Sequence, residues 1–470
     1  MTLVPVSGAA AAKQLNVALG YVAGVGSSTG KTGWTTLVQS YSNKLGTVEA
    51  SKYTYAYDVI GNITSVTDKT GKKINYEYDV LGQLTRVNDE SAGITSAYAY
   101  DQGGNLTQAV EYAYTADILG EAVKTHTYRY DETWKDLLVE YDGQTITYDA
   151  VGNPISYLGN TMTWEYGRQL AGISRGDAPI QYGYTPDGTR LSKAVNGQKT
   201  EYTLNGSTVL SETTGDETLY YYYSNGKLVE IGYKNGGAAE VYYFVTRNAQ
   251  GDITAIYDAK TCTLVGSYTY DAWGRVLSAT AVNDPNGITE KNPFRYRGYY
   301  YDRETGFYYL QSRYYDPGIG RFVNADDPYI LYSDQNNSNQ YNLFTYCLNN
   351  PINNVDLNGY FAIVLGAAFE LAIITTLCIS LIWYVNTPSF QSSLESIYQS
   401  VNNAITSAST ALAKGKSNPK DLEKGMSKNQ KEKFQRAIED YKNDNGMPPD
   451  YNIPWPFLEE LADEVKELYK

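Results

Sequence analysis

A short unit that begins with tyrosine and aspartate recurs along the first two thirds of the chain. Its copies are Tyr57-Asp58 with Gly61-Asn62, Tyr78-Asp79 with Gly82-Gln83, Tyr100-Asp101 with Gly104-Asn105, Tyr148-Asp149 with Gly152-Asn153, Tyr184 with Gly188, Asn248 with Gly251-Asp252, and Tyr270-Asp271 with Gly274-Arg275. The first three copies start 21 and 22 residues apart. Such spacing indicates an array of structural repeats.

Each unit predicts a β-hairpin. The stretch before the turn alternates tyrosine with smaller residues, as in Tyr53-Thr54-Tyr55-Ala56-Tyr57, which is the period of a strand buried on one side. Aspartate bonds nearby backbone amides, and glycine accepts positive φ, so the Asp-x-x-Gly segment supplies the turn. A lone hairpin leaves its apolar face in water. That face stays unburied until neighbouring hairpins stack beside it.

The composition fits such a sheet and excludes several classes of function. The chain has 48 tyrosines and 10 phenylalanines, and tyrosine suits a half-buried strand because its ring packs while its hydroxyl finds a polar partner. A net charge of −14 argues against nucleic-acid binding through a basic surface. The three cysteines are far apart and predict neither a disulfide framework nor a metal site.

His126 is the only histidine of the chain, and it lies in a Thr/Tyr strand pattern, so we interpret it as a sheet residue. A single histidine leaves too few ligands for a histidine-based zinc site outside the repeats. It also argues against a Ser-His-Asp triad there. We therefore expect no metal and no cofactor.

A tyrosine-rich stretch, 293–359, follows the repeats. It reads PFRYRGYYYDRETGFYYLQSRYYDPGIGRFVNADDPYI, then a polar spacer, then NLFTYCLNNPINNVDLNGY. Turn residues divide it into short predicted strands. This stretch resembles the core-associated segment of Rhs/YD-repeat proteins, through its YYDPxxGRF run and its NNP…VDxNG ending. The repeats before it resemble the YD repeat of Rhs and teneurin-type proteins.

The resemblance covers roughly residues 53–360 and implies a mainly β fold, a spiralling antiparallel sheet of hairpins around a hollow shell. We divide the chain into a lead-in without clear periodicity (1–52), the repeat array (53–291), the core (292–360), an apolar segment (361–385) and a variable C-terminal module (386–470). Proteins of this family are usually much longer, so we expect this chain to be a shortened or terminal piece of one.

The resemblance also implies a self-cleaving aspartyl protease in the core, which cuts just after the final motif and frees a tail. The first carboxylate corresponds to Asp326, for which the neighbouring Asp327 could substitute, and the second corresponds to Asp356. Two carboxylates close enough to share one proton provide an acid and a base that activate water. Arg321 could position or bias one of them. The hypothesis places the cut after Tyr360.

This copy departs from the family pattern at two positions. Leu357 replaces the proline that usually follows the second aspartate, and Tyr360 replaces the leucine before the expected cut. These departures leave a structural interpretation open, in which Asp326 and Asp356 only cap turns.

The segment 361–385 has 25 residues and a single charge, Glu370. As a helix it would extend about 37 Å, longer than the ~30 Å hydrocarbon core of a bilayer. Trp383 and Tyr384 lie at one end, as interfacial aromatic residues do. We predict a transmembrane helix. The alternative is a core helix sheltered within the shell.

The last residues, 386–470, predict a small α-helical module. Leu394, Ile397 and Val401 begin one apolar stripe of helical period. The sequence Ser427-Lys428-Asn429-Gln430 is a capping box that starts a second helix, with Phe434, Ile438 and Tyr441 on one face. No catalytic motif is present in this module.

Two functional interpretations follow. In the first, the chain is the C-terminal portion of a polymorphic Rhs-type toxin used in bacterial competition, with a cognate immunity protein as partner. In the second, it is a non-enzymatic YD-repeat surface or adhesion protein anchored by 361–385. Both interpretations place the protein outside the cell, at its surface or on a membrane, although the N-terminus lacks the pattern of a secretory signal.

Overall fold

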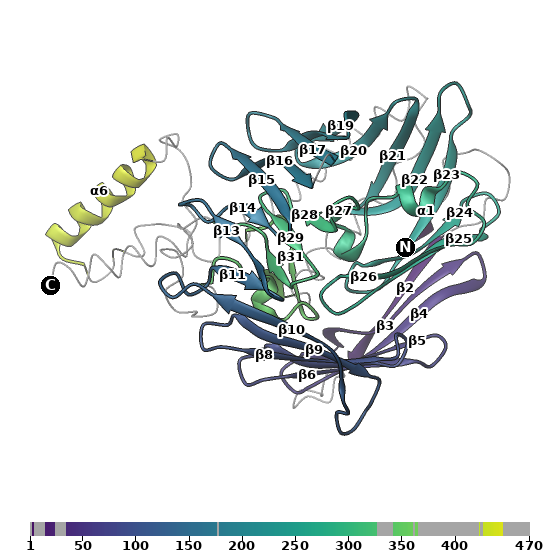
Figure 1. The fold of residues 1–470 in the computed structure, drawn as a ribbon, viewed down its shortest axis with the longest axis horizontal. Coiled ribbons are helices and arrows are strands. Elements are labelled where there is room, and N and C mark those ends of the chain that lie inside the picture. Colours follow the sequence, from purple (N-terminus) through teal and green to yellow (C-terminus); the bar gives the residue numbers. More distant parts are fainter. Residues whose placement is uncertain are drawn as a thin grey trace. The chain divides into compact units, whose positions relative to one another are not determined.

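The computed structural model describes residues 2–3, 15–23, 34–175, 178–326, 342–360, 362–364, 423 and 426–444. The chain divides into two compact units, Met1–Ser380 and Leu381–Lys470. The regular structure described in the first unit is almost entirely antiparallel β-sheet, as predicted (Figure 1).

In the described residues, two large sheets follow the order of the sequence. The first has twelve strands: β1 (Thr2–Leu3), β2 (Leu15–Ala23), β3 (Trp34–Leu45), β4 (Val48–Tyr57), β5 (Ile63–Asp68), β6 (Lys73–Tyr78), β7 (Leu84–Asp89), β8 (Ile94–Tyr100), β9 (Leu106–Ala113), β10 (Ala122–Tyr130), β11 (Leu138–Tyr141) and β12 (Gln144–Thr145). The second has fourteen: β13 (Thr147–Tyr148), β14 (Pro154–Tyr157), β15 (Asn160–Glu165), β16 (Gln169–Arg175), β17 (Ala178–Tyr184), β18 (Arg190–Val195), β19 (Gln198–Asn205), β20 (Thr208–Thr214), β21 (Glu217–Ser224), β22 (Lys227–Asn235), β23 (Val241–Arg247), β24 (Ile253–Asp258), β25 (Leu264–Tyr270) and β26 (Val276–Ala281).

The core segment that follows is built from shorter pieces. They are α1 (Ile288–Lys291), a 3-10 turn (Tyr296–Gly298), β27 (Tyr300–Asp302), β28 (Phe307–Tyr309), β29 (Tyr314–Asp316), β30 (Arg321–Phe322), a second 3-10 turn (Cys347–Asn349), β31 (Asn354–Asp356) and β32 (Ala362–Val364). These green strands lie between the two sheets in Figure 1.

Each described Asp-x-x-Gly turn is held by its own side chains. In the first, Asp58 Oδ1 accepts hydrogen bonds from the amides of Ile60 and Asn62, at 3.0 and 2.8 Å. Asp58 Oδ2 accepts from Asn62 Nδ2 at 2.9 Å, and Gly61 adopts φ +95°. Because an L-side chain at that φ is strained, the turn requires glycine. The later copies repeat these bonds. In each of them the aspartate and the residue four positions later hold the turn together.

The tyrosine before each turn couples one hairpin to the preceding strands. Its hydroxyl donates to a backbone carbonyl 10 to 24 residues earlier in the chain. The pairs are Tyr57 with Val38, Tyr78 with Ile63, Tyr100 with Leu84, Tyr130 with Leu106, Tyr148 with Leu138, Tyr184 with Leu170, and Tyr270 with Ile253. A bulge in the strand register lies at most of these tyrosines, for example between Ala99 and Tyr100. Phenylalanine could fill the same space but could not make the bond.

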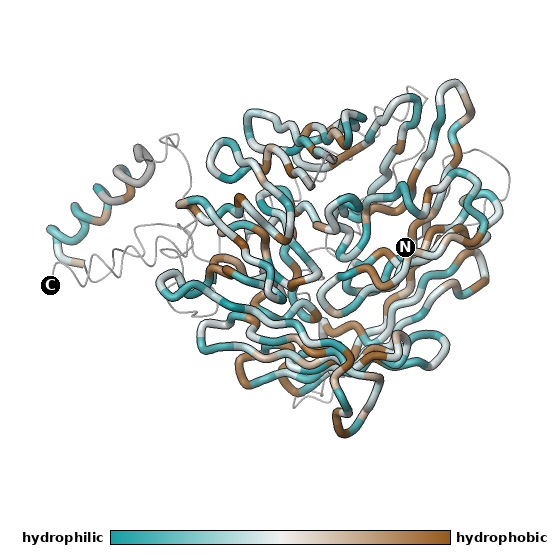
Figure 2. The backbone as a smooth tube through the Cα atoms, viewed as in Figure 1, coloured by the Kyte–Doolittle hydropathy of each residue, from teal (hydrophilic) through white to brown (hydrophobic). Residues whose placement is uncertain are grey.

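The inner faces of both sheets pack on the core segment. In the largest cluster, Tyr308, Tyr315 and Tyr346 of the core segment are 0% exposed and pack with Leu84 and Leu106 of the first sheet. Figure 2 shows strands on which teal, pale and brown residues alternate. Tyrosine, which supplies much of this interior, is closer to neutral on the hydropathy scale than the aliphatic side chains. The packing therefore depends on aromatic area as well as on aliphatic side chains.

A buried ionic cluster joins the second sheet to the core segment. Arg190 Nη1 on β18 lies 2.6 Å from Asp302 Oδ2, and Lys193 Nζ lies 3.0 Å from Asp302 Oδ1. The Arg190 guanidinium also faces the rings of Tyr309 and Tyr300, at 4.3 and 4.7 Å from their centroids. Burial opposes the ionisation of Asp302, but the two cations hold its pKa below the ordinary value. Asp302 therefore keeps its ion pairs with Arg190 and Lys193 in the interior of the protein.

The described parts of the lead-in belong to the first sheet. Strands β2 and β3 pair from Leu15 with Leu45 up to Ala23 with Trp34, and β3 pairs with β4. Strands β2 and β3 carry no Tyr-Asp turn, so the repeat motif could not reveal them.

The transmembrane helix predicted for 361–385 is wrong where the structure describes it. Residues Ala362–Val364 form β32, whose amides and carbonyls pair with β31 in a hairpin, with Asn354 opposite Val364. The rest of that segment lies outside the described residues. None of the helices that the structure does describe is long and apolar enough to cross a bilayer.

The helix predicted after Ser427 is confirmed within the second unit. It is α6 (Lys428–Asp444), and its start has both bonds of a capping box. The Ser427 amide donates to Gln430 Oε1 at 2.8 Å, and the Gln430 amide donates to Ser427 Oγ at 3.3 Å. Phe434 is fully buried. The first stripe of the tail, from Leu394, lies outside the described residues.

We predict that Tyr100→Phe lowers the free energy of unfolding by about 1–3 kcal/mol, because the buried Leu84 carbonyl loses its donor, 2.6 Å away. Chemical denaturation followed by tyrosine fluorescence would measure the change. Tyr166→Phe is the matched control, since Tyr166 is 88% exposed and should lose almost nothing. Equal effects in the two variants would contradict the coupling role of the repeat tyrosines.

Glu230 gives a prediction for pH. Burial, with Glu240 adding to it, raises the pKa of Glu230 to about 7, and its Oε1 has no hydrogen-bond partner among the residues that the structure describes. A carboxyl whose pKa is raised on folding supports the fold while protonated, and that support is lost as pH rises from 4.5 through 7. Glu230→Gln should therefore stabilise the protein by about 1–3 kcal/mol at pH 8 and by little near pH 4.5.

Thermal unfolding at the two pH values measures this difference. Glu201→Gln is the control, because the Glu201 side chain is 67% exposed. A Glu230→Gln variant that is no more stable than the wild type at pH 8 would contradict the assignment of a costly buried charge.

Candidate active site

Asp326 is positioned by an irregular pairing of two pieces of the core segment. After β30, the Phe322 amide donates to the Phe344 carbonyl at 2.9 Å. Four residues later the Asp326 amide donates to the Leu343 carbonyl, also at 2.9 Å. The chain therefore runs beside residues 342–345 and carries Asp326 into the interior, where it is 6% exposed.

Asp356 ends β31 and begins a tight turn. Its Oδ1 accepts from the Gly359 amide at 2.7 Å and from the Asn358 amide at 3.3 Å. Gly359 has φ +81°, and a Cβ there would lie 2.5 Å from Ser312 Oγ and 2.9 Å from the Leu310 carbonyl oxygen. Only glycine fits this turn without strain. One oxygen of Asp356 thus caps the turn, as the structural interpretation of the sequence expected.

Arg313 brings the two aspartates together. Its Nη2 lies 2.9 Å from Asp326 Oδ2 and 3.6 Å from Asp356 Oδ2. Its Nη1 donates to the Leu343 carbonyl at 3.1 Å, and its Nε donates to the Gly359 carbonyl. The guanidinium also lies 3.5 Å from the centroid of the Phe322 ring. A single buried side chain therefore contacts both carboxylates and the turn before Tyr360.

The electrostatics of the site make the two carboxylates unequal. Burial raises the pKa of Asp356; Arg313 and the two turn amides oppose this effect, and the charge of Asp326 adds to it. Burial also lowers the pKa of Arg313, while the two aspartates oppose that change. Asp326, which lies closer to Nη2, gains the stronger ion pair. Such an arrangement can hold one carboxyl protonated beside one carboxylate.

The structure brings two of the predicted site residues together and places another elsewhere. Asp326 and Asp356, 30 positions apart in sequence, meet at Arg313. Asp327 lies outside the described residues. Arg321 instead donates to Asn105 Oδ1 at 3.0 Å and to Tyr130 Oη at 2.9 Å, and among the described residues its bonds go to the first sheet and its connection rather than to either aspartate.

Arg313 was not among the residues predicted from the sequence. The sequence feature that could have revealed it is the run Arg313-Tyr314-Tyr315-Asp316, in which the tyrosines beside the arginine predict an interior strand. A buried arginine needs carboxylate or carbonyl partners, so its place in that run points to an internal acid.

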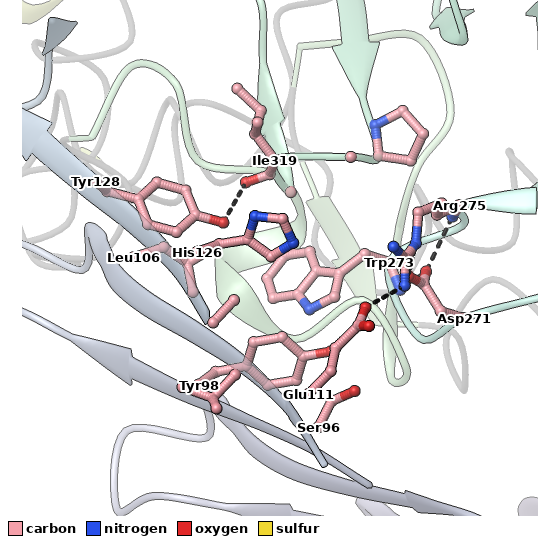
Figure 3. Close-up of a pocket in the computed structure, with 15 residues that line it drawn as sticks. Ser96, Tyr98, Leu106, Glu111, His126, Tyr128, Asp271, Trp273, Arg275 and Ile319 are labelled. Carbon is pink, nitrogen blue, oxygen red and sulfur yellow. Dashed lines mark hydrogen bonds and ion pairs between the residues drawn. The ribbon is translucent and has the colours of Figure 1, made fainter. Parts of the chain in front are cut away.

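His126 lies beside a small cavity rather than in a catalytic cluster. Its Nδ1 is 2.6 Å from Asp142 Oδ2 and 2.7 Å from Tyr141 Oη. The cavity, of about 40 Å³, is also lined by Trp273 and by Arg275, which pairs with Glu111 (Figure 3). It has room for about one water molecule. In the part of the chain that the structure describes, no three or more His, Cys, Asp or Glu residues are placed to hold a metal ion.

Comparisons with known proteins agree with this architecture. The family model described as teneurin YD-shell matches residues 21–352. The tRNA3(Ser)-specific nuclease WapA of Bacillus spizizenii is 36% identical over 242 residues, which cover 49% of this chain and 10% of the nuclease. The double-stranded DNA deaminase toxin A of Burkholderia cenocepacia is 33% identical over 92 residues, which cover 19% of this chain and 6% of the toxin.

Among solved structures, the crystal structure of TcdB2-TccC3-TEV matches with a TM-score of 0.56 and 17% identity. The match covers 73% of this chain and 18% of the chain in that structure, and it shows a common fold. The chain thus spans only a small part of the length of each of these relatives.

Proposed function

The chain belongs to the teneurin YD-shell family, and from this membership we propose that it is the shell and core of an Rhs-type polymorphic toxin whose core cuts the chain after Tyr360. The cut frees the residues from Phe361 onward as an effector used in bacterial competition. The observation that carries the proposal is the pair of buried aspartates at one guanidinium, directly beside the turn that ends at Tyr360.

The relatives support the division into a common shell and a variable tail. The nuclease and the deaminase toxin differ in the activities that their names give, yet both resemble part of this chain. A common carrier joined to different effectors explains this. On that basis we expect the tail to have its own activity and a cognate immunity protein that blocks it.

The proposed reaction is the hydrolysis of the Tyr360–Phe361 peptide bond. Asp326, paired with Arg313 at 2.9 Å, is the ionised base, and Asp356, whose pKa is raised by burial, carries the proton. Asp326 takes a proton from water as the water oxygen bonds to the Tyr360 carbonyl carbon. Asp356 gives its proton to the Phe361 nitrogen as the C–N bond breaks. The products are a carboxyl group on Tyr360 and an amine on Phe361.

The surroundings of the bond fit this role. Tyr360 is 51% exposed, so water can reach it, whereas the aspartates are nearly buried. Arg313 Nε holds the Gly359 carbonyl, one residue before the bond, which limits its movement relative to the carboxylates.

We predict that the purified wild-type chain yields a fragment of about 110 residues that begins at Phe361. Asp356→Asn and Asp326→Asn should each abolish it, because the first removes the proton donor and the second removes the base. Cleavage should slow as pH rises through the raised pKa of Asp356, since the acid is then lost. Gel electrophoresis with N-terminal sequencing identifies the product.

Asp327→Asn is the matched control, since an unchanged rate in that variant would assign the base to Asp326. A wild-type chain that stays intact under all folding conditions would refute self-cleavage.

We also predict that the fragment from Phe361 to Lys470 stops bacterial growth when it is produced in the cytoplasm, because the proposal makes it the effector. Colony counts after induction measure the effect, and the fragment 293–360 provides the control. A harmless tail on a chain that stays intact and is displayed at the cell surface would instead favour the adhesion protein.

A further inference from the structure

We propose that Arg168, in the turn between β15 and β16 of the second sheet, is a positioning residue for Asp326, so that the core can cut only after this part of the repeat sheet has docked on it. The inference rests on the proposed self-cleavage and adds to it a residue from outside the core segment. Arg168 lies 158 positions before Asp326 in the sequence.

The peptide group between Ala325 and Asp326 is held at both of its polar atoms. Its carbonyl, that of Ala325, accepts a hydrogen bond from Arg168 Nη1. Its N–H, that of Asp326, donates to the Leu343 carbonyl at 2.9 Å. Because a peptide group is planar, fixing both atoms fixes the orientation of the whole group. The direction in which the Asp326 side chain leaves the backbone is then strongly restricted, toward Arg313.

A second repeat turn holds the preceding residue. The Ala325 amide donates to the Gly152 carbonyl at 3.2 Å. Gly152 belongs to the Asp149-x-x-Gly152 turn before β14, and a Cβ on it would lie only 2.8 Å from Ala325 Cβ. Ala325 itself is 0% exposed. Two turns of the second sheet, the one between β13 and β14 and the one between β15 and β16, thus contact the residue next to Asp326.

The charge of Arg168 also reaches the site. Burial lowers the pKa of Arg313, the two aspartates oppose this, and the like charge of Arg168 lowers that pKa further. A second cation near the carboxylates favours their ionised form. Arg168 therefore has two separable effects: its hydrogen bond orients the peptide, and its charge supports the ionised base.

The arrangement makes cleavage depend on folding. The core segment alone contains Arg313 and both aspartates, but it lacks Arg168 and Gly152. A chain whose second sheet has not yet formed would lack the bonds from Arg168 and Gly152, and only bonds within the core segment, such as that of the Asp326 amide to the Leu343 carbonyl, would orient this peptide. The tail would then stay attached until the repeats had assembled around the core.

The test compares Arg168→Met with Arg168→Lys in the full chain. We expect Arg168→Met to cut roughly 10- to 100-fold more slowly, as misplaced catalytic groups do. The acid limb of its pH–rate profile should move to higher pH, because removing a cation makes the base harder to deprotonate. Arg168→Lys keeps the charge and one donor, so it should recover much of the rate and the wild-type acid limb.

Arg129→Met is the control, because Arg129 is a mostly exposed arginine of the first sheet that pairs with Glu140, and it should cut like the wild type. An Arg168→Met variant with the wild-type rate would overturn the inference. So would a slow Arg168→Met with an unchanged acid limb and no recovery in Arg168→Lys, which would indicate a merely structural role. A wild type that never cuts would instead refute the proposed self-cleavage itself, and this inference with it.

Discussion

The fold depends on hydroxyl groups that must find a partner inside a sheet. A tyrosine ring on the inner face of a hairpin is buried by its neighbours, and its hydroxyl then needs an acceptor. The repeat supplies one in the backbone carbonyl of earlier strands, as for Tyr78 and Ile63 at 2.6 Å. Each such bond spans two hairpins and lies at or near a bulge, so it fixes their register as well as their contact. As a result, the turns follow one another along the sheets in the order of the sequence.

The core segment recognises those turns through asparagine side chains. Asparagine suits the task because its amide offers both a donor and an acceptor to the backbone of a turn. Asn353 Oδ1 accepts a hydrogen bond from the Ile63 amide at 2.7 Å. Asn349 Nδ2 donates to Gln83 Oε1 at 2.8 Å and to the Gly104 carbonyl at 2.6 Å. Asn342 Nδ2 donates to Asn105 Oδ1 at 2.6 Å. Three consecutive repeats thereby hold the segment that runs from Leu343 to Asp356. Both of these residues take part in the candidate site.

The sequence predicts what local chemistry determines. The hairpins and their turns follow from short motifs, and α6 follows from its cap, whereas the two aspartates are identified through the family resemblance. Arg168 could not be found this way, because its partner lies 157 positions away and its own turn has no special pattern. The same limit applies to the variable positions of the turns: Ile60 is 80% exposed, whereas Trp273, at the equivalent position, is 3% exposed and packs with the core segment. Burial there depends on which repeat meets the core, and the motif does not carry that information.

The two interpretations of Asp356 are compatible, because its oxygens have different partners. Oδ1 caps the turn to Gly359, while Oδ2 faces Arg313. The turn that looks purely structural is what aims the second oxygen at the guanidinium and brings the Gly359 carbonyl to Arg313 Nε. The departures from the family pattern lie outside this interior, since Leu357 is 49% exposed and Tyr360 is 51% exposed. A leucine in place of proline changes the freedom of the chain beside the proposed cut more than the contacts of the buried aspartates. The part of the pattern that this chain retains is the part that holds the charges.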